Sequence, residues 1–393
     1  MSSSAPFQIN LDEDHTEIRE GVRRICIDFP GGYWQELDQL EHYPTDFVKA
    51  MTEAGFLSAL IPETYGGAGL PLRAAGVVLE EIHASGGNAA ATHAQMYTMG
   101  TVLRHGSEAQ KRKYLPEIAA GRLRLQAFGV TEPTSGTDTT QLKTRAVRDG
   151  DHYVINGQKV WTSRALHSDL MLLLARTTPL DQVKKRTEGL SVFLIDMREA
   201  QGHGMTIRPI KTMINHNTTE VFFDNLRIPA DTLVGTEGQG LRHIMDGMNA
   251  ERILISHESI GDSKWFIKTA VAYANQRIIF QRPIGQNQGI QFPIAKAYAQ
   301  QQAADLMVRK ASAMFEAGLH CGEEANLSKL LSAEAAWEAA EACMQTHGGF
   351  AYACEYNIER NWREARVLRT APISTNMILS YIAEHVLGLP RSY

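Results

Sequence analysis

Hydrophobic residues recur along the chain at two different periods. Up to residue 126, segments such as TEIREGVRRICIDF and LRAAGVVLEEIHASGG carry apolar residues three and four positions apart, which is typical of amphipathic helices. Ser107 followed by Gln110 is a capping-box signal for the start of a further helix. From residue 127 to 234 the pattern changes to short apolar runs separated by turn residues, such as LQAFGV and LSVFLIDM, which predict strands.

Turn residues divide the β part into strands, and the last third of the chain is predicted to be helical again. Asp149-Gly150 and Asn156-Gly157 are dipeptides that can each reverse a strand. From residue 235 to 393 the helical period returns, with one apolar stripe predicted along LRHIMDGMNAERILI and a long alanine-rich helix predicted to end at Gly348 and Gly349. We therefore expect an α+β chain with helical, β and helical parts at 1–126, 127–234 and 235–393, which excludes a simple alternating βαβ order.

Composition narrows the class of protein. The 393 residues are 44% hydrophobic and 21% charged, with a net charge of −5, which argues against a nucleic-acid binder. No apolar run approaches the roughly 20 residues of a membrane span, and the acidic start is unlike a targeting peptide, so we expect a cytoplasmic protein. Four cysteines form no CxxC pair and are expected to be reduced thiols rather than a disulfide or zinc site. GxGxxG, P-loop, HExxH and GxSxG motifs are absent from the sequence.

Two segments of the β part carry candidate chemistry. GVTEPTSGTD, residues 129–138, places short hydroxyls and backbone donors after a predicted strand, and NGQKVWTSRA, residues 156–165, lies a short way further on. Alone, the first is most simply a β-turn. Together the two resemble loops of the acyl-CoA dehydrogenase flavoprotein family, which read roughly T-E-P-x-x-G-S-D and N-G-x-K-x-W-I-T. The resemblance extends to FDNLRIPADTLVG, NQRIIFQRPIGQNQGIQ and QTHGGFAYACEYNIERNWREAR.

This resemblance implies a β-barrel-like middle domain, a C-terminal four-helix bundle and bound FAD. The edge of the isoalloxazine ring carries acceptors that need backbone N–H and hydroxyl donors. Arg277, Gly348 and Gly349 would bind the phosphates of FAD held by a neighbouring subunit. The cofactor-binding residues that it implies are Phe128, Val130, Thr131, Thr137, Trp161, Thr162, Ser163, Arg277, Phe280, Gln288, Gly348, Gly349, Ser374 and Asn376. The family's Phe-Gly is Phe280-Gln281 here, a departure expected to matter little.

The catalytic base is the point at which the sequence departs from most of the family. Most members carry a glutamate in a C-terminal YEGT turn, which here reads Ala371-Pro372-Ile373-Ser374. Isovaleryl- and long-chain-type members place the glutamate on a helix instead, at the position of Glu251. Counted along one continuous helix, Glu251 lies on the shoulder of the buried stripe, so its carboxylate is either the base or part of a structural ion pair. The resemblance adds Asn249, Arg252 and Thr137 as substrate-binding residues.

Pro372 raises a second question about the reaction. In the family the N–H at the glutamate position binds the thioester carbonyl, and proline has no N–H. Either another N–H serves, or the chemistry differs from desaturation, as in relatives that act as desulfinases or monooxygenase-like enzymes.

Three hypotheses follow. The leading one is an FAD-dependent acyl-CoA dehydrogenase of fatty acid metabolism that passes electrons to an electron-transfer flavoprotein and forms a homotetramer, a dimer of dimers. The second keeps flavin and acyl-CoA with different chemistry, and the third is a helical scaffold that has lost flavin. We expect His83, His93 and His105 to be packing or surface residues, and Tyr97 and Met99 to be core residues.

Overall fold

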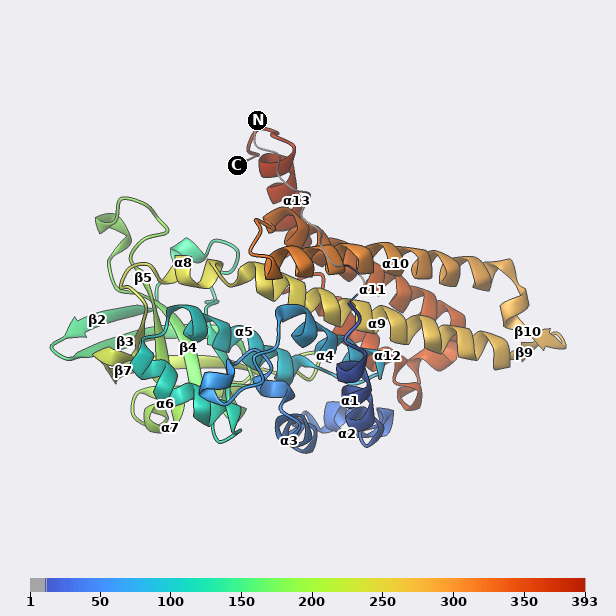
Figure 1. Cartoon of the computed structure of the whole chain (residues 1–393), viewed down its shortest axis with the longest axis horizontal. Helices are drawn as coiled ribbons and strands as arrows, with labels where there is room; N and C mark the ends of the chain where they lie inside the picture. Colours follow the sequence, from blue (N-terminus) through green and yellow to red (C-terminus); the bar gives the residue numbers. More distant parts are fainter. Residues whose placement is uncertain (1–10, 12, 393) are drawn as a thin grey trace. The chain divides into compact units, whose positions relative to one another are not determined.

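The computed structural model describes Leu11 and residues 13–392, and its contacts divide the chain into two compact units. The helical unit comprises Met1–Glu36, Pro71–Ala89 and Asn249–Tyr393, and the sheet unit comprises Leu37–Leu70 and Ala90–Met248. The order of elements along the chain is helices, then strands, then helices (Figure 1). This order confirms the predicted fold class, whereas the boundaries after residues 126 and 234 stay a prediction.

The sheet unit is built on one eight-stranded sheet in the order β6-β7-β3-β2-β4-β5-β8, with β1 paired to β4. Antiparallel pairs dominate, and β1 and β2 run parallel to β4. The strands are β1 (Leu125–Gly129), β2 (Arg145–Asp149), β3 (His152–Ser163), β4 (Leu170–Arg176), β5 (Leu190–Asp196), β6 (Met205–Pro209), β7 (Thr218–Pro229) and β8 (Leu233–Val234). The unit's helices are α3 (Thr45–Glu53), α5 (Ala90–His105), α6 (Glu108–Ala119), α7 (Met197–Ala200) and α8 (Gly240–Met245).

Strand β4 shows why the sheet carries a core on both faces. Leu170, Leu172 and Leu174 belong to one apolar cluster, which also contains Val102 of α5. The alternate residues, such as Met171 and Leu173, belong to a second cluster. Successive side chains of a strand point to opposite faces, so a strand buried on both faces has no polar alternation.

One of the two predicted strand reversals is correct and the other is wrong. Asp149-Gly150 lies at the turn between the paired strands β2 and β3, with Gly150 at φ 60°. Asn156-Gly157 instead lies inside β3, which continues to Ser163 and pairs with β7 across a register shift at this point. Gly157 is required there because a Cβ would lie 2.5 Å from the Oγ1 atom of Thr144. The glycine therefore serves a close approach and a bulge rather than a hairpin.

The helical unit is held together by three long helices, α9 (Met248–Gln276), α10 (Gln288–Glu316) and α11 (Gly322–His347), which run alongside one another (Figure 1). Ser256 of α9 bonds Ser328 of α11 at 3.2 Å, and His257 of α9 bonds Ser312 of α10 at 3.3 Å. The remaining elements are α1 (Thr16–Ile27), α2 (Gly31–Leu40, which ends in the sheet unit), α4 (Leu72–Ala84), α12 (Ile358–Val367), α13 (Thr375–Tyr381) and the short hairpin β9 (Ile278–Ile279) with β10 (Arg282–Pro283).

Helix ends agree with two predictions and contradict one. Ser107 and Gln110 form the predicted capping box of α6, and α11 ends at Gly348 with φ 58°. The single stripe predicted over 241–255 is wrong, because α8 ends at Met245 and α9 begins at Met248. Met245 is 53% exposed as a result.

Candidate functional site

The segment that follows β1 presents backbone donors and is braced by a buried lysine. The N–H groups of Val130 and Thr131 make no hydrogen bond within the described part of the chain. Lys159 of β3 is fully buried, and its Nζ atom donates to the Val130 carbonyl and to Oε1 of Glu132, both at 2.9 Å. Glu132 also accepts from the N–H groups of Lys143 and Thr144 at 2.7 and 2.9 Å. The arrangement holds the loop while leaving two N–H groups available to an acceptor.

Burial and opposite charge together set the pKa values of Lys159 and Glu132. Burial lowers the pKa of Lys159 to about 8, although the Glu132 carboxylate acts in the opposite direction. Burial likewise tends to raise the pKa of Glu132, but the Lys159 ammonium and the donated N–H groups hold it below its ordinary value. Both residues stand in the two quoted motifs, yet sequence reasoning assigned neither to the site. The alternation of side chains along the strand makes position 159 inward-facing. A lysine at an inward-facing position was the signal that could have identified it.

Trp161 lies in a strained, exposed position on the same strand. The pairing of β3 with β7 shifts register between Lys159 and Thr162, and Trp161 lies in this bulge with φ 60° and 59% of its surface exposed. A left-handed backbone is an outlier for a bulky residue and is characteristic of ligand-binding positions. Thr162 points inward, 1% exposed, and its Oγ1 atom bonds no described residue.

The other predicted residues of the sheet unit lie in less constrained positions. Phe128 packs edge-on against Tyr97, with ring centroids 5.7 Å apart, and Met99 is fully buried. Thr137 is exposed in the loop, and Ser163 is half-buried at the end of β3, paired with Thr218.

The predicted phosphate-binding residues lie in the helical unit, and some of them come together. The guanidinium of Arg277 lies 5.5 Å from the ring centroid of Phe350. This phenylalanine directly follows Gly348 and Gly349 in the sequence. Gly348 has φ 58° and ψ −128°, and a Cβ on either glycine would meet no atom within 4 Å. The backbone here is therefore open to close approach by a ligand. Gln288 is exposed at the start of α10.

The Phe280-Gln281 dipeptide shows that the departure from the family's Phe-Gly has a structural consequence. Both residues lie in the turn of the β9–β10 hairpin with positive φ, 50° and 67°. Phe280 is 95% exposed. A two-residue hairpin turn with two positive φ values favours glycine, so Gln281 adds strain where glycine would not.

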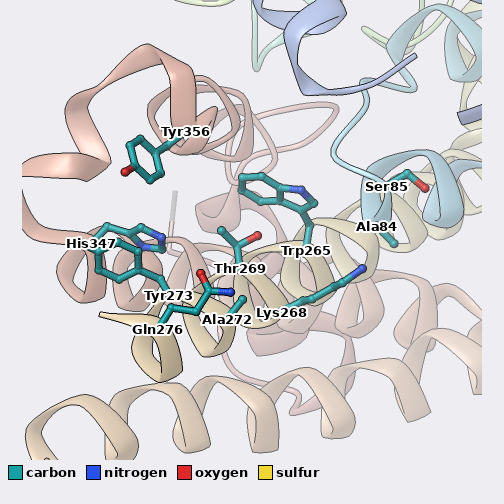
Figure 2. Close-up of a pocket in the computed structure, with 10 residues that line it drawn as sticks. All are labelled: Ala84, Ser85, Trp265, Lys268, Thr269, Ala272, Tyr273, Gln276, His347 and Tyr356. Atoms are coloured by element: carbon teal, nitrogen blue, oxygen red, sulfur yellow. The ribbon is translucent and has the colours of Figure 1, made fainter. Parts of the chain in front are cut away.

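A pocket of about 350 Å³ in the helical unit was not predicted from the sequence. Figure 2 shows aromatic side chains around it, with His347 and Tyr273 stacked and with Tyr356 and Trp265 also on its walls. The His347 and Tyr273 ring centroids are 4.0 Å apart. Trp265 and Tyr273 belong to α9, whereas His347 ends α11 and Tyr356 follows it, so no single local pattern indicates the pocket.

The first turn of α9 contains the candidate base. Glu251 and Arg252 are each 7% exposed, in a run of buried residues from Ala250 to Ser263. Arg252 donates from Nη1 to Oδ1 of Asn249 at 2.9 Å, and its buried Nε atom bonds no described residue. Burial lowers the pKa of Arg252, opposed by Tyr381 and Glu251. The prediction that Glu251 is buried is confirmed. The continuous helix from which it was inferred is not present, because the helix is broken between α8 and α9.

The turn that replaces the family's glutamate turn precedes α13. Ser374 is the N-cap of α13, and its Oγ atom accepts from the Met377 N–H at 3.4 Å. Asn376 is exposed. On the other side of the turn, the Ile373 carbonyl accepts a hydrogen bond from Nζ of Lys329 at 2.7 Å. Lys329 is 1% exposed and was not identified from the sequence.

The described histidines, cysteines and helices give no sign of a disulfide, a metal site or a membrane span. His83 is buried and bonds Asp262 at 2.7 Å, whereas His93 packs edge-on against Tyr97 and His105 stacks on His243. All four cysteines are free thiols. Over the described ranges, no three histidine, cysteine or acidic side chains are placed to hold a metal ion, and no helix is long and apolar enough to cross a bilayer.

Comparison with known proteins identifies the family to which these units belong. The N-terminal, middle and C-terminal domains of acyl-CoA dehydrogenases match residues 12–122, 127–226 and 238–387. The chain belongs to the acyl-CoA dehydrogenase family and is a flavin-dependent oxidoreductase of CH–CH groups.

Individual relatives match over nearly the full chain. An acyl-CoA dehydrogenase of Bacillus subtilis is 33% identical over 97% of this chain and all of its own length. The acyl-CoA dehydrogenase FadE12 of Mycobacterium tuberculosis is 31% identical over 97% of this chain and 98% of its own. Among solved structures, a glutaryl-CoA dehydrogenase in complex with glutaryl-CoA has a TM-score of 0.90 at 29% identity, covering 98% of each chain.

Proposed function

We propose that this protein desaturates an acyl-CoA thioester between the α and β carbons, with FAD as cofactor and Glu251 as the base. The observation that carries the proposal is the buried first turn of α9, which holds a carboxylate and an arginine whose Nε atom bonds no described residue. A buried donor left unbonded, such as the Nε atom of Arg252, is costly unless a ligand uses it.

The residues of the chain fit the cofactor that the family uses. The unbonded N–H groups of Val130 and Thr131 suit the acceptors of a flavin edge, and exposed Trp161 offers a ring face. Arg277 and the open backbone at Gly348 and Gly349 suit a pyrophosphate. When bound, FAD would supply the two-electron acceptor for the β hydrogen. Thr162, Ser163, Thr137, Phe128, Gln288, Ser374 and Asn376 remain predicted cofactor contacts.

The protein's own part in the reaction is proton removal. An oxygen of the Glu251 carboxylate accepts the α proton, and the pair of electrons left behind forms the new double bond as the β hydrogen departs. The α proton is weakly acidic, so donors must withdraw charge through the thioester oxygen. Asn249 and Arg252, which are joined by a hydrogen bond in the same first turn of α9, would orient the thioester or the CoA moiety.

The test uses the Glu251→Gln variant, which keeps the shape of the side chain but cannot accept the proton. We expect flavin bleaching by a panel of acyl-CoAs under anaerobic conditions to slow by about 10²–10⁴-fold. The enoyl-CoA product, two hydrogens lighter, should disappear with it. Glu341→Gln, a change to an exposed carboxylate on α11, is the matched control and should bleach normally. Undiminished bleaching by the Glu251 variant would rule out Glu251 as the base.

A second reaction is supported by Pro372, which cannot supply an N–H to the thioester oxygen. It retains FAD and acyl-CoA but releases sulfite or consumes oxygen. Measuring enoyl-CoA, sulfite and oxygen in the same incubation separates the two, because desaturation predicts enoyl-CoA alone.

The remaining parts of the proposal concern partners. The exposed Phe280 at the tip of a strained hairpin supports contact with a neighbouring subunit, and hence a homotetramer, which sedimentation would test. An electron-transfer flavoprotein is the proposed acceptor, and a cytoplasmic location and a role in fatty acid metabolism stay predictions.

A further inference from the structure

Lys329 is a buried cation that no part of the proposed reaction has used so far. It lies on α11, 1% exposed, with its Nζ atom 2.7 Å from the carbonyl oxygen of Ile373. In the part of the chain that the structure describes, this oxygen is the one acceptor within hydrogen-bond distance of the ammonium. An ammonium carries three donors, so its desolvation is poorly compensated, and such a group is rarely kept for stability alone.

The charges around Lys329 leave a local excess of positive charge. Burial lowers its pKa to about 8, Glu334 of α11 raises it, and Arg252 of α9 and Arg369 lower it further. The single carboxylate in this set is shared, because Arg369 donates to Glu334 from Nε at 2.9 Å. Lys329 therefore shares Glu334 with Arg369, and Arg252 interacts with the Glu251 carboxylate, so three cations are set against two carboxylates.

The lysine determines which way one peptide group of this turn faces. The Ile373–Ser374 peptide is trans, so its carbonyl and its N–H point in opposite directions. Binding of the carbonyl by Lys329 thus directs the Ser374 N–H away from the lysine. The positive charge also draws electron density toward the carbonyl oxygen, which makes this N–H a stronger donor.

Of the N–H groups of residues 371–375, those of Ile373 and Ser374 bond no described residue, and the Ser374 N–H is the one that shares its peptide with the carbonyl bound by Lys329. The Ala371 N–H bonds the Val367 carbonyl at 2.9 Å, and the Thr375 N–H lies 3.4 Å from the Arg369 carbonyl. Pro372 has none. The Ser374 N–H makes no hydrogen bond within the described ranges.

We propose that Lys329 is a positioning residue for the acyl-CoA reaction: it holds the Ile373 carbonyl so that the Ser374 N–H donates to the thioester oxygen, in place of the donor that Pro372 lacks. The inference rests on the proposed function for its substrate class. It does not rest on Glu251, because polarising the carbonyl and removing the proton are separate acts.

The first experiment measures polarisation without turnover. Cinnamoyl-CoA is titrated into the FAD-loaded enzyme, and the absorption band of its conjugated thioester is followed, since polarising the carbonyl moves this band to longer wavelength. We expect a shift with the unsubstituted enzyme and with Glu251→Gln. We expect most of it to be lost in Lys329→Met and partly restored in Lys329→Arg, with the dissociation constant changing less than about threefold.

A second pair of variants tests the N–H itself. Ser374 has φ −69°, which proline can adopt, so Ser374→Pro removes the N–H, while Ser374→Ala removes only the capping hydroxyl. The proline variant should lose the band shift, and its flavin bleaching by acyl-CoA should slow by about 10²-fold, the cost of one donor to a developing oxyanion. The alanine variant keeps the N–H, so it should lose less of the band shift and less of the bleaching rate than the proline variant.

The pH dependence gives a signature that a purely structural lysine lacks. With the charges of Glu334, Arg252 and Arg369 fixed over this range, the band shift of the unsubstituted enzyme should weaken as the pH rises through about 8, and that of Lys329→Arg should not.

Each outcome decides between the claims. An intact band shift in Lys329→Met, or equal behaviour of the two Ser374 variants, overturns the role of Lys329 and leaves Glu251 untouched. Normal bleaching in Glu251→Gln, with the shift lost in Lys329→Met, overturns the base and leaves Lys329. If Lys329→Met fails to bind FAD, the Ser374 pair and Lys329→Arg decide.

Discussion

Two buried lysines bind backbone carbonyls in this chain, and they differ in what balances their charge. Lys159 binds the Val130 carbonyl and is paired with the carboxylate of Glu132 at 2.9 Å. Lys329 binds the Ile373 carbonyl, but its nearest charges include two arginines, and the one carboxylate is already bonded to Arg369. In both cases the next residue, Thr131 or Ser374, has an N–H that bonds no described residue.

The difference indicates two uses of the same side chain. A buried ion pair is strongly destabilising to break, because the remaining charge is left uncompensated. Lys159 is therefore part of what holds its loop folded. Lys329 has no such partner to leave behind, and its positive charge acts through the Ile373–Ser374 peptide on the N–H that would meet a thioester oxygen as that oxygen gains negative charge.

The largest expected effect on stability comes from breaking the balanced pair. Glu132→Gln leaves the Lys159 ammonium buried without its carboxylate and should lower the free energy of unfolding by about 3–5 kcal/mol, measured by urea denaturation. Asp138→Asn, a change to an exposed partner of Arg186 in the same loop, is the control and should cost less than about 1 kcal/mol. Equal stabilities would mean that Glu132 does not balance Lys159.

A buried histidine provides a second balanced cation with a pH signature. Burial alone would lower the pKa of His83, but Asp262 at 2.7 Å, with Glu258, raises it to about 9. The charged histidine therefore adds stability in full below its ordinary value of 6.5, and this contribution is lost as the pH rises through about 9. Asp262→Asn should cost about 3 kcal/mol at pH 6 and less at pH 10. A cost that does not change with pH would contradict the pairing.

The strain beside Lys159 has a smaller expected effect. Trp161→Gly relieves a left-handed backbone at φ 60° but adds freedom to the unfolded chain, so stability should change by no more than about 1 kcal/mol. Affinity for FAD, measured by fluorescence titration, should instead fall by about tenfold through loss of the ring. A loss of several kcal/mol with unchanged affinity would show that Trp161 is a packing residue.

The smallest effect is expected from the unbalanced lysine. Lys329→Met removes a buried charge without stranding a carboxylate, so the free energy of unfolding at pH 7 should stay the same or rise. Because burial lowers the pKa of Lys329 from 10.5 to about 8, the folded state binds fewer protons than the unfolded state between these values. Stability of the unsubstituted protein should thus increase with pH over that interval, and the variant should lack this increase. A large destabilisation at pH 7 would erase the contrast with Lys159.

The sequence predicted features that short segments determine. The capping box at Ser107, the β2–β3 turn at Gly150 and the end of α11 at Gly348 depend on neighbouring residues and were correct. Asn156-Gly157 was wrong because the contact with Thr144, distant in sequence, decided what the glycine does. The break between α8 and α9 was likewise missed, although the burial of Glu251 was predicted correctly.

The candidate site was predictable as motifs but not as interactions. The two loop motifs led to Val130 and Thr131, whose N–H groups bond no described residue, and to Trp161, whose backbone has a positive φ. The roles of Lys159 and Lys329 depend on which carbonyl each ammonium bonds. Tertiary packing decides this, and the hydrophobic periodicity of the sequence does not predict it. The aromatic pocket of the helical unit was missed for the same reason.

Proton transfer at Glu251 is the central claim, and isotope exchange tests it most directly. The FAD-loaded enzyme and its Glu251→Gln variant are incubated in deuterium oxide with an acyl-CoA that bleaches the unsubstituted enzyme, and deuterium at the α carbon is measured by mass spectrometry. We predict exchange at the α carbon with the unsubstituted enzyme and a loss of about 10²–10⁴-fold in the variant. Exchange at an equal rate in both proteins would show that another group removes the proton.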